Sequence, residues 1–390
     1  MIRLRRRQVN INLNFEGIQQ LNVNIDRNEV SYPILIGDNL KGKVGELISQ
    51  YHKGKKVVIV TDENVGQLYL PLISEQLEAS GYDIYKYTLP PGEKAKTNQY
   101  LQKGYNYLLK KEFNRDSLIV ALGGGVVGDL AGYLAATYMR GIKYIQIPTS
   151  LIAQVDSSVG GKTAINHNYG KNLIGSFYHP EMVIIDIEFL KTLPVRHFNN
   201  GMAEVIKYAL IRDIDFFNYL RENSEEISNL KANKLKYIIN ASCQHKVNIV
   251  NEDEKDKNKR RLLNFGHTIG HALESIFNNR EQGYLHGEAV ALGMYLSSCL
   301  SENKGYLSST QRSRIEILLK KYNLPVQLKK KVKIESIWEK IKFDKKRGNK
   351  GLAWILLDGI GESFICKDIG LKELKGLNCL LYFQCNDTIR

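Results

Sequence analysis

Three histidines lie close together in the second half of the chain. His267 and His271 are four residues apart and His286 follows within 20 residues, although the chain has only eight histidines. Residues i and i+4 share one face of a helix, and imidazoles grouped in this way often bind a divalent metal ion. A third ligand has to come from elsewhere, and Glu204, in an otherwise apolar helical stretch, is the candidate. The alternative is a structural role, with the histidines hydrogen-bonded inside the fold and Glu204 solvated.

A second candidate site is the glycine-rich run Gly123–Asp129, which follows a predicted strand and opens a predicted helix. Gly123, Gly125 and Gly128 fit the pattern G-x-G-x-x-G. Glycines there let backbone N–H groups approach a phosphate at a helix N-terminus. The usual dinucleotide fingerprint lies in the first βα unit and has an acidic residue about 20 positions later, whereas the acidic candidates Asp62 and Glu63 precede this run. The run predicts a pyrophosphate site on a fold other than the standard one.

Several basic residues stand beside glycine or asparagine. Lys162 follows a pair of glycines, and Lys171 lies between Gly170 and Asn172. Lysines after glycine turns suit phosphate and carboxylate oxygens. Further cations of this kind are Arg140, Lys207, Lys246, Arg260 and Lys345. Aromatic side chains do not alternate with them, which argues against a nucleic-acid surface.

Length and composition limit the class of protein. The 390 residues are 43% apolar and carry a net charge of +14, which indicates two folded domains rather than a disordered chain. The charge suits an anionic ligand, with an ordinary solvated surface as the alternative. No apolar stretch is long enough to span a membrane, and the basic start lacks the apolar run of a signal peptide. The five cysteines form no C-x-x-C pair, so we expect reduced thiols in a cytoplasmic protein.

The elements that must position these residues change in kind near Pro194. Before it, predicted strands alternate with predicted helices over 65–80 and 97–112, which indicates a parallel sheet covered on both faces. The strands are expected at 32–36, 56–61, 82–89, 117–122, 144–147 and 183–186. After it, helices are expected at 202–212, 215–226, 235–251, 268–277, 289–305 and 311–322. We therefore expect an N-terminal extension over 1–22, an α/β domain over 23–194 and an all-α domain over 195–390.

Nine motifs, taken in chain order, resemble those of the 3-dehydroquinate synthases of the sugar phosphate cyclase superfamily. They are Gly123–Asp129, Tyr138–Gly141, Gln146–Ser150, Asp156–Asn166, Gly170–Gly175, Met202–Lys207, Asn264–His271, Leu285–Glu288 and Asp344–Lys346. The resemblance spans residues 30 to 360. It implies an N-terminal nucleotide-binding domain that takes NAD, a helical metal- and substrate-binding domain, and an active site in the cleft between them.

The resemblance also implies the reaction. The family converts 3-deoxy-D-arabino-heptulosonate 7-phosphate to 3-dehydroquinate and phosphate, a carbon–oxygen lyase step of the shikimate pathway to aromatic amino acids. Transient oxidation by NAD is followed by phosphate elimination, re-reduction and intramolecular aldol cyclisation, with Zn²⁺ or Co²⁺ polarising the reacting hydroxyl. A homodimer is implied as well, because the arginine that matches Arg140 reaches the neighbouring subunit's site in this family.

Individual roles follow from the matching positions. The implied metal ligands are Glu204, His267 and His286, which leaves His271 for hydrogen bonding and proton transfer. Phosphate-end positions are Lys162, Asn172, Arg140 and Lys345, and contacts to the carboxylate, hydroxyls and metal are Lys207, Lys246, Arg260, Asn264 and Asp156. The NAD side comprises Asp62, Glu93, Lys96, Gly124, Gly125, Val126, Val127, Gly128, Asp129, Thr149, Ser150, Lys162, Lys171, Phe189, Leu190, Lys191 and Thr192. Pro91 departs from the family, in which aspartate often precedes the glycine of this segment.

Three other classes of function remain as alternatives. Sister sugar phosphate cyclases share the metal set but change the glycine–lysine segment, and the unaltered run Asp156–Asn166 argues against them. An NAD- and metal-dependent alcohol or glycerol dehydrogenase would need no phosphate clamp, so Lys162, Asn172 and Arg140 argue against it. A basic nucleic-acid-binding protein is the third. We expect a small phosphorylated sugar acid as the partner, and neither nucleic acid nor a membrane.

Overall fold

The computed structural model describes residues 17–25, 30–254, 256, 259–277, 283–345 and 353–377. Contacts divide the chain into two compact units. The first unit comprises residues 1–194 and 232–255, and the second comprises residues 195–231 and 256–390.

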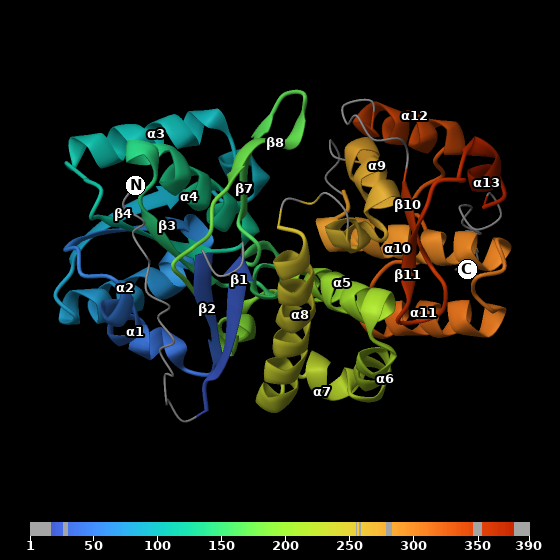
Figure 1. The fold of residues 1–390 in the computed structure, drawn as a ribbon, viewed down its shortest axis with the longest axis horizontal. Coiled ribbons are helices and arrows are strands. Elements are labelled where there is room, and N and C mark those ends of the chain that lie inside the picture. Colours follow the sequence, from blue (N-terminus) through green and yellow to red (C-terminus); the bar gives the residue numbers. More distant parts are fainter. Residues whose placement is uncertain are drawn as a thin grey trace, which may run out of the picture. The chain divides into compact units, whose positions relative to one another are not determined.

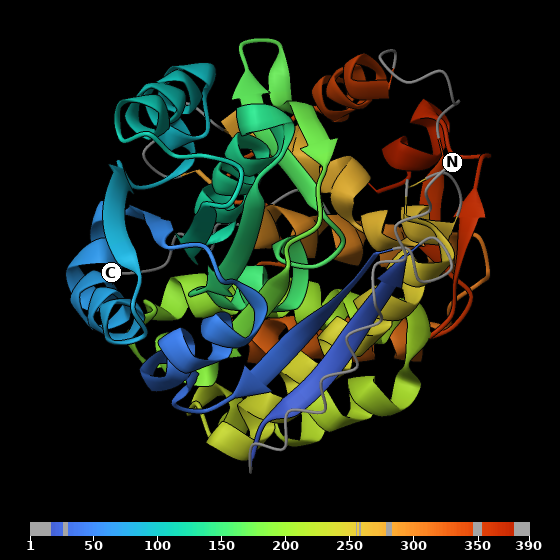
Figure 2. The same cartoon turned by 60° about the vertical axis from the view of Figure 1, so that its left-hand side comes forward.

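A seven-stranded sheet forms the centre of the first unit (Figure 1). Its order is β1-β2-β9-β6-β5-β3-β4. The strands are β1 (Gln19–Ile25), β2 (Val30–Gly37), β3 (Lys56–Asp62), β4 (Asp83–Leu89), β5 (Leu118–Gly123), β6 (Lys143–Pro148) and β9 (Met182–Asp186). All neighbouring strands pair in parallel except β1, which runs antiparallel beside β2 at the edge (Figure 2). The predicted parallel sheet is therefore confirmed, with one antiparallel edge strand added.

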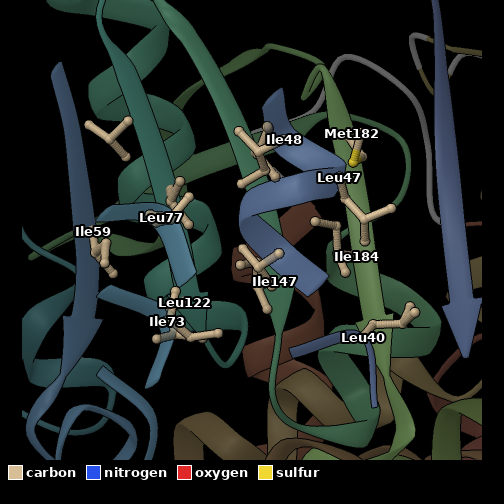
Figure 3. Close-up of a cluster of buried hydrophobic side chains, with 14 of the residues drawn as sticks. Leu40, Leu47, Ile48, Ile59, Ile73, Leu77, Leu122, Ile147, Met182 and Ile184 are labelled. Carbon is tan, nitrogen blue, oxygen red and sulfur yellow. The ribbon is translucent and has the colours of Figure 1, made fainter. Parts of the chain in front are cut away.

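Helices cover both faces of this sheet. Figure 1 shows α1 (Val44–Tyr51) and α2 (Glu63–Ala79) on one side of the strands, and α3 (Asn98–Lys110) and α4 (Gly125–Thr137) on the other. Within β3, Val57 and Ile59 pack toward α1 and α2, while Val58 and Val60 pack toward α3 and α4. Successive side chains of a strand point to opposite faces, so a strand buried on both faces is a continuous apolar run. Figure 3 shows the α1 and α2 side of this core.

The first strand of the sheet begins earlier in the chain than expected. The extension expected over 1–22 includes Gln19–Asn22, and these residues belong to β1. The strand alternates apolar and polar side chains (Leu21, Asn22, Val23, Asn24), and Val23 is buried, which is the pattern of an edge strand with one covered face. Residues 1–16 lie outside the described part of the chain.

One long helix of the second half belongs to the first unit. Helix α8 (Ala232–Glu252) packs on β1, β2 and the turn Ala153–Ser157. The Cys243 thiol donates to the Gln154 carbonyl at 3.3 Å, and the Asn24 N–H donates to Asn251 Oδ1 at 3.1 Å. The division expected from the sequence placed all residues after 194 together. It differs here because the apolar face of α8 covers the β1–β2 pair.

A small β-hairpin adds to the first unit. Strands β7 (Lys162–His167) and β8 (Gly170–Phe177) pair antiparallel, outside the main sheet. These strands were not predicted from the sequence. They carry three residues expected at the site, Lys162, Lys171 and Asn172.

The second unit is helical, as predicted, with one hairpin added. Its helices are α5 (Val195–Arg212), α6 (Ile214–Glu222), α7 (Ser224–Ser228), α9 (His267–Phe277), α10 (His286–Asn303), α11 (Ser309–Lys321), α12 (Ile334–Lys345) and α13 (Leu371–Lys375). The expected all-α composition is corrected by β10 (Trp354–Leu357) and β11 (Ser363–Cys366), which form because the short apolar run of β10 is buried against α10. Helix α10 also packs on α5, α9 and α11. Among the described residues, no helix has the length and apolarity to cross a membrane.

Candidate active site

Three helices of the second unit carry the expected metal ligands. Glu204 lies on α5, His267 begins α9 and His286 begins α10. Helices α5 and α10 pack so closely that their backbones are in contact. A Cβ atom on Gly287 would lie 1.9 Å from the Asn200 carbonyl oxygen of α5, and the Gly287 N–H donates to Asn200 Oδ1 at 2.6 Å. Close packing on α5 therefore fixes the first turn of α10, which holds His286.

The three ligand side chains converge on one point. His267 Nε2 lies 3.7 Å, and His286 Nε2 3.5 Å, from Glu204 Oε1. One ligand atom from each residue falls within 4.8 Å of the others. The His271 ring also belongs to this cluster, with its centroid 5.3 Å from that of His267. A carboxylate and two imidazoles form a donor set typical of catalytic zinc.

Further groups orient each of these ligands. The second carboxylate oxygen of Glu204 accepts a hydrogen bond from Lys207, which is buried on the same helix. His267 Nδ1 lies 3.2 Å from the Phe265 carbonyl oxygen. His286 Nδ1 lies 3.2 Å from Glu274 Oε2. Both imidazoles thus direct Nδ1 toward an acceptor and Nε2 toward Glu204, the arrangement in which outer partners orient metal-binding histidines.

The protonation states of the two imidazoles differ. Burial lowers the pKa of His267 to about 3, so this imidazole is neutral and keeps a lone pair for a metal. Burial also disfavours a charge on His286, but hydrogen bonds to Glu204 and Glu274 outweigh it and raise the pKa of His286 to about 10. A metal ion that binds here takes the place of the His286 proton, because a ligating imidazole must be deprotonated. The residues therefore fit a divalent cation.

A cavity of about 230 Å³ lies beside this cluster. Asn264, His267 and His271 line it, together with Arg261, Thr268, Ile341, Ala353 and Ile355. Arg261 lines this cavity, and the adjacent Arg260, which was expected at the site, is buried. The cavity offers a small polar ligand one guanidinium, one amide and two imidazoles.

The expected NAD residues gather at one edge of the first unit's sheet. Asp62 ends β3 and Gly124 follows β5. Thr149 and Ser150 follow β6, and the segment Ile187–Thr192 follows β9. Carboxyl ends of parallel strands meet at the same edge, and the chain reverses its direction across the sheet between β3 and β5. In open α/β sheets, this reversal is where nucleotides bind.

The glycine run forms the N-terminus of a buried helix. Gly124 precedes α4, whose first turn presents backbone N–H groups that lack an acceptor within the helix. Ser150 Oγ lies 3.4 Å from where a Cβ on Gly124 would stand, is enclosed, and makes no hydrogen bond within the described part of the chain. A Cβ on Gly125 would lie 3.0 Å from Ser157 Oγ. An unsatisfied hydroxyl beside N–H groups at a helix start fits a pyrophosphate.

Two ion pairs join residues of the expected site in the first unit. Lys96 Nζ lies 2.5 Å from Asp129 Oδ2 and also contacts Asn172 Oδ1, so it links the glycine-run helix to the β7–β8 hairpin. Lys246 on α8 lies 2.6 Å from Asp156 Oδ1. Burial raises the pKa of Asp129, opposed by Lys96 and by the more distant charge of Lys246.

The sequence matches two adjoining family models, 3-dehydroquinate synthase N-terminal over residues 86–200 and 3-dehydroquinate synthase C-terminal over residues 201–347. The chain belongs to the 3-dehydroquinate synthase family. The 3-dehydroquinate synthase of Vesicomyosocius okutanii subsp. Calyptogena okutanii is 45% identical over 345 residues, covering 88% of this chain and 94% of the relative.

Solved structures of other cyclases share the fold of this 3-dehydroquinate synthase family member. The 2-epi-5-epi-valiolone synthase from Streptomyces hygroscopicus subsp. jinggangensis, with NAD⁺ and Zn²⁺ bound, is 26% identical with a TM-score of 0.84, and the match covers 90% of this chain and 97% of that one. A 2-deoxy-scyllo-inosose synthase complexed with carbaglucose-6-phosphate, NAD⁺ and Co²⁺ is 25% identical with a TM-score of 0.82, covering 92% and 99%.

Other residues matched to the 3-dehydroquinate synthase family have structural contacts of their own. Asp62 Oδ1 accepts the N–H groups of Asn64 and Val65 at 2.9 and 3.1 Å and so caps α2. Glu93 Oε2 accepts from Asn166 Nδ2 at 2.6 Å. The hydroxyls of Thr192 and Tyr69 lie 2.5 Å apart. These contacts hold the rim of the expected NAD site in place.

Several matched side chains are buried in the core or lie on the surface. The side chains of Val127, Phe189 and Leu190 are in the core, so only their backbone can contact a cofactor. Lys191 is exposed and pairs with Glu188 at 2.7 Å. Arg140, Lys162 and Lys171 are exposed, while Val126 is half-buried in the first turn of α4. Lys345 ends α12, and its side chain lies outside the described part of the chain.

Three residues of this region were not among those expected from the sequence. Arg261 and Thr268 line the cavity, and Glu274 contacts His286. A signal for Glu274 was present, because His267, His271 and Glu274 stand at i, i+4 and i+7 and so share one face of α9. For Arg261 and Thr268 the sequence offered no comparable signal.

Proposed function

We propose that this protein is a 3-dehydroquinate synthase, a carbon–oxygen lyase that converts 3-deoxy-D-arabino-heptulosonate 7-phosphate to 3-dehydroquinate and phosphate. The observation that carries the proposal is the convergence of Glu204, His267 and His286 in a chain of this family. The proposed cofactors are NAD and a divalent metal, Zn²⁺ or Co²⁺. When bound, NAD accepts and returns a hydride and the metal polarises the reacting hydroxyl.

In this proposal, the residues of the second unit hold the metal and the reacting end of the substrate. Lys207 holds one oxygen of Glu204, so the other remains directed at the two imidazoles. His267, kept neutral by burial, supplies a lone pair without first losing a proton. His271 and Asn264 face the adjoining cavity, where an imidazole can move a proton and an amide can bind a hydroxyl or carboxylate.

The residues of the first unit bind NAD and the phosphate end. The first turn of α4 and Ser150 suit the pyrophosphate of NAD. Lys162, Lys171 and Asn172 on the β7–β8 hairpin supply cationic and amide groups suited to a phosphate. Because Lys96 contacts both Asp129 and Asn172, it holds the cofactor loop and the phosphate-binding hairpin in a fixed relation. The proposed reaction requires both units to act on one substrate molecule.

The family assignment supports this reaction over the alternatives. The identity to curated 3-dehydroquinate synthases is much higher than that to the valiolone and inosose synthases. A net dehydrogenase would have no use for the cations on the β7–β8 hairpin. The positive net charge suits the anionic sugar phosphate, so we propose no role in nucleic-acid binding. We also propose a cytoplasmic location, consistent with the buried free thiols of Cys243, Cys299 and Cys366.

The decisive assay follows phosphate and NADH in the same cuvette with a catalytic amount of NAD. We expect many phosphates released per NAD with no steady growth of NADH, because the hydride is returned before the product leaves. A chelator should abolish turnover, and Zn²⁺ or Co²⁺ should restore it. NADH that accumulates in step with product would show a dehydrogenase instead, and full activity without metal would contradict the proposed ligand set.

We further propose that the protein acts as a homodimer. Leu173, Ile174 and Phe177 on β8 are 51%, 38% and 43% exposed, an unusual density of large apolar side chains for a solvent-facing strand. Met139 and Arg140 have left-handed backbone conformations (φ 51° and 66°), which are costly and point to a functional position. Light scattering should give twice the chain mass, and Leu173→Asp should shift the protein toward the monomer.

A further inference from the structure

The carboxylate of Glu274 contacts a proposed metal ligand on the side turned away from the metal position. Its Oε2 lies 3.2 Å from His286 Nδ1, while His286 Nε2 faces Glu204 Oε1 at 3.5 Å. We infer that Glu274 is a positioning residue, which holds the His286 imidazole in the orientation and tautomer that a metal ion requires. This inference rests on the proposed metal set of Glu204, His267 and His286.

The two histidines of this set are held in the same way by different groups. His267 Nδ1 has the Phe265 carbonyl at 3.2 Å, and its Nε2 faces Glu204 Oε1 at 3.7 Å. His286 has the same arrangement, except that a carboxylate replaces the carbonyl. When Nδ1 donates its proton to an acceptor, Nε2 keeps the lone pair that binds a metal. Glu274 therefore determines which nitrogen of His286 is the ligand atom.

The position of Glu274 suits this role. It lies on α9 two turns after His267, and its side chain is 10% exposed. Helices α9 and α10 pack closely, because a Cβ on Gly293 of α10 would stand 1.9 Å from the Gly266 carbonyl oxygen at the start of α9. A carboxylate held by such packing keeps its partner oriented at little entropic cost, and its charge makes the imidazole a stronger donor.

A second grouping of the same side chains gives a different role. Ligand atoms of His271, Glu274 and His286 also lie within 4.8 Å of one another. In that grouping Glu274 would be a ligand itself, and neither Glu204 nor His267 would bind the metal. The buried Lys207–Glu204 pair aims its second oxygen at both Nε2 atoms, which favours the first grouping.

The test measures zinc affinity of the full-length protein by competition with a chromophoric chelator, without substrate. Glu274→Ala should weaken zinc binding by about 10- to 100-fold, the usual effect of losing such an outer partner. Glu274→Gln keeps the volume and an acceptor oxygen, so it should lose less. Glu316→Gln is the matched control, because Glu316 is a half-buried carboxylate of the same unit that pairs with Arg312 and Lys320. Its zinc affinity should equal that of the wild type.

His267→Ala and His271→Ala, measured alongside, separate failure of this inference from failure of the proposed function. We expect His267→Ala to lose zinc binding and His271→Ala to keep it. A folded Glu274→Ala with wild-type zinc affinity would overturn the inference and leave the metal set intact. Loss of zinc in His271→Ala with retention in His267→Ala would overturn both, because the second grouping would then be the site.

The visible spectrum of the Co²⁺-loaded protein separates positioning from a merely structural role. Glu274→Gln should shift the cobalt bands, since the donor strength of His286 changes, whereas Glu316→Gln should leave them unchanged. An unshifted spectrum together with unchanged affinity in Glu274→Gln would count against the inference. If Glu274→Ala fails to fold, the Gln variant carries the test alone.

Discussion

Glu204 is a fully buried carboxylate that two kinds of cation can neutralise. One is the ammonium group of Lys207, three residues along the same helix and also buried. The other is the group that faces Oε1, which is protonated His286 in the metal-free protein and the proposed metal ion when it binds. Removing one partner of a buried ion pair leaves an uncompensated charge, whereas removing both does much less harm.

We therefore predict that Lys207→Met, measured without metal, loses about 3 kcal/mol of unfolding free energy. The double variant Lys207→Met/Glu204→Gln should recover most of that loss. Saturating zinc should stabilise the single variant more than the double one, because only the single variant retains the carboxylate ligand. Urea unfolding with and without zinc measures all three effects. Additive losses in the double variant would show that the two side chains are not coupled.

His52 is a buried histidine remote from the chemistry. It is 4% exposed, and its Nε2 makes no hydrogen bond within the described part of the chain. Burial lowers the pKa of His52 to about 4, with the nearby charge of Lys143 acting in the same direction and Asp116 opposing both. As pH falls below the unfolded value of about 6.5, the unfolded chain takes up the proton first. The stability due to neutral His52 is complete above that pH and is lost as pH falls toward 4.

We predict that protonation linked to His52 lowers the wild type's free energy of unfolding by about 2 kcal/mol when the pH falls from 7 to 5. His52→Phe keeps a ring that can stack on Tyr82 but cannot titrate, so its stability should fall less over the same range. The measurement is the free energy of urea unfolding of both proteins at the two pH values. The change in unfolding free energy with pH decides the outcome, because the substitution itself can alter the absolute stability. Equal slopes would mean that the His52 side chain is solvated.

At the scale of the elements, glycines let α10 approach its neighbours closely enough to bring the ligands together. A Cβ on Gly287 would overlap the Asn200 carbonyl of α5, at 1.9 Å. Both partners are backbone, so a side chain cannot rotate away to relieve the overlap. Forced overpacking of this kind typically costs about 1–3 kcal/mol.

We predict that Gly287→Ala lowers the melting temperature and weakens zinc binding together, because the substitution displaces the turn that holds His286. Gly370→Ala is the control in the same unit. Its Cβ would stand 3.4 Å from the flexible end of Glu373, and its backbone φ of −118° suits alanine. Calorimetry and zinc titration of both variants provide the comparison. Unchanged zinc affinity in a destabilised Gly287→Ala would separate the helix packing from the ligand geometry.

At the scale of the whole molecule, the two proposed cofactors belong to different units. The metal ligands lie on α5, α9 and α10 of the second unit, and the proposed NAD residues lie in the first. Each ligand should therefore stabilise the unit that binds it more than it stabilises the other unit. At a hundred times its Kd, a ligand stabilises the state that binds it by about 2.7 kcal/mol.

We predict that hydrogen exchange, followed by mass spectrometry, separates the two effects. Zinc alone should slow exchange in peptides from α5, α9 and α10, and NAD alone should slow it in peptides from β5 and α4. Bovine serum albumin mixed into each sample controls for general effects of zinc on exchange. Protection of the first unit by zinc alone would contradict the division of the ligands between the units.

Local patterns in the sequence determined a large part of this protein. Each parallel strand of the main sheet was predicted within a few residues, because a strand buried on both faces is a continuous apolar run, as in β3. The antiparallel edge strand β1 was not predicted. Six helical stretches of the second half were predicted from their spacing, whereas α12 and α13 were not. The proposed metal set came from a dense cluster of histidines, of which His267 and His286 are the proposed ligands, and from the family motifs that surround them and Glu204. The family followed from motifs that are contiguous in sequence.

Only the tertiary structure decided which distant segments meet. Helix α8 reads as one more helix of the second half, yet Asn251 contacts Asn24 across more than 200 positions and α8 joins the first unit. Glu274 has no motif of its own, and its role depends on the packing of α9 against α10. The spacing of apolar residues indicates which face of a segment is buried, because burial repeats with the turn of a helix or the pleat of a strand. It does not report the partner, which is selected by the shape and chemistry of side chains far away in the chain.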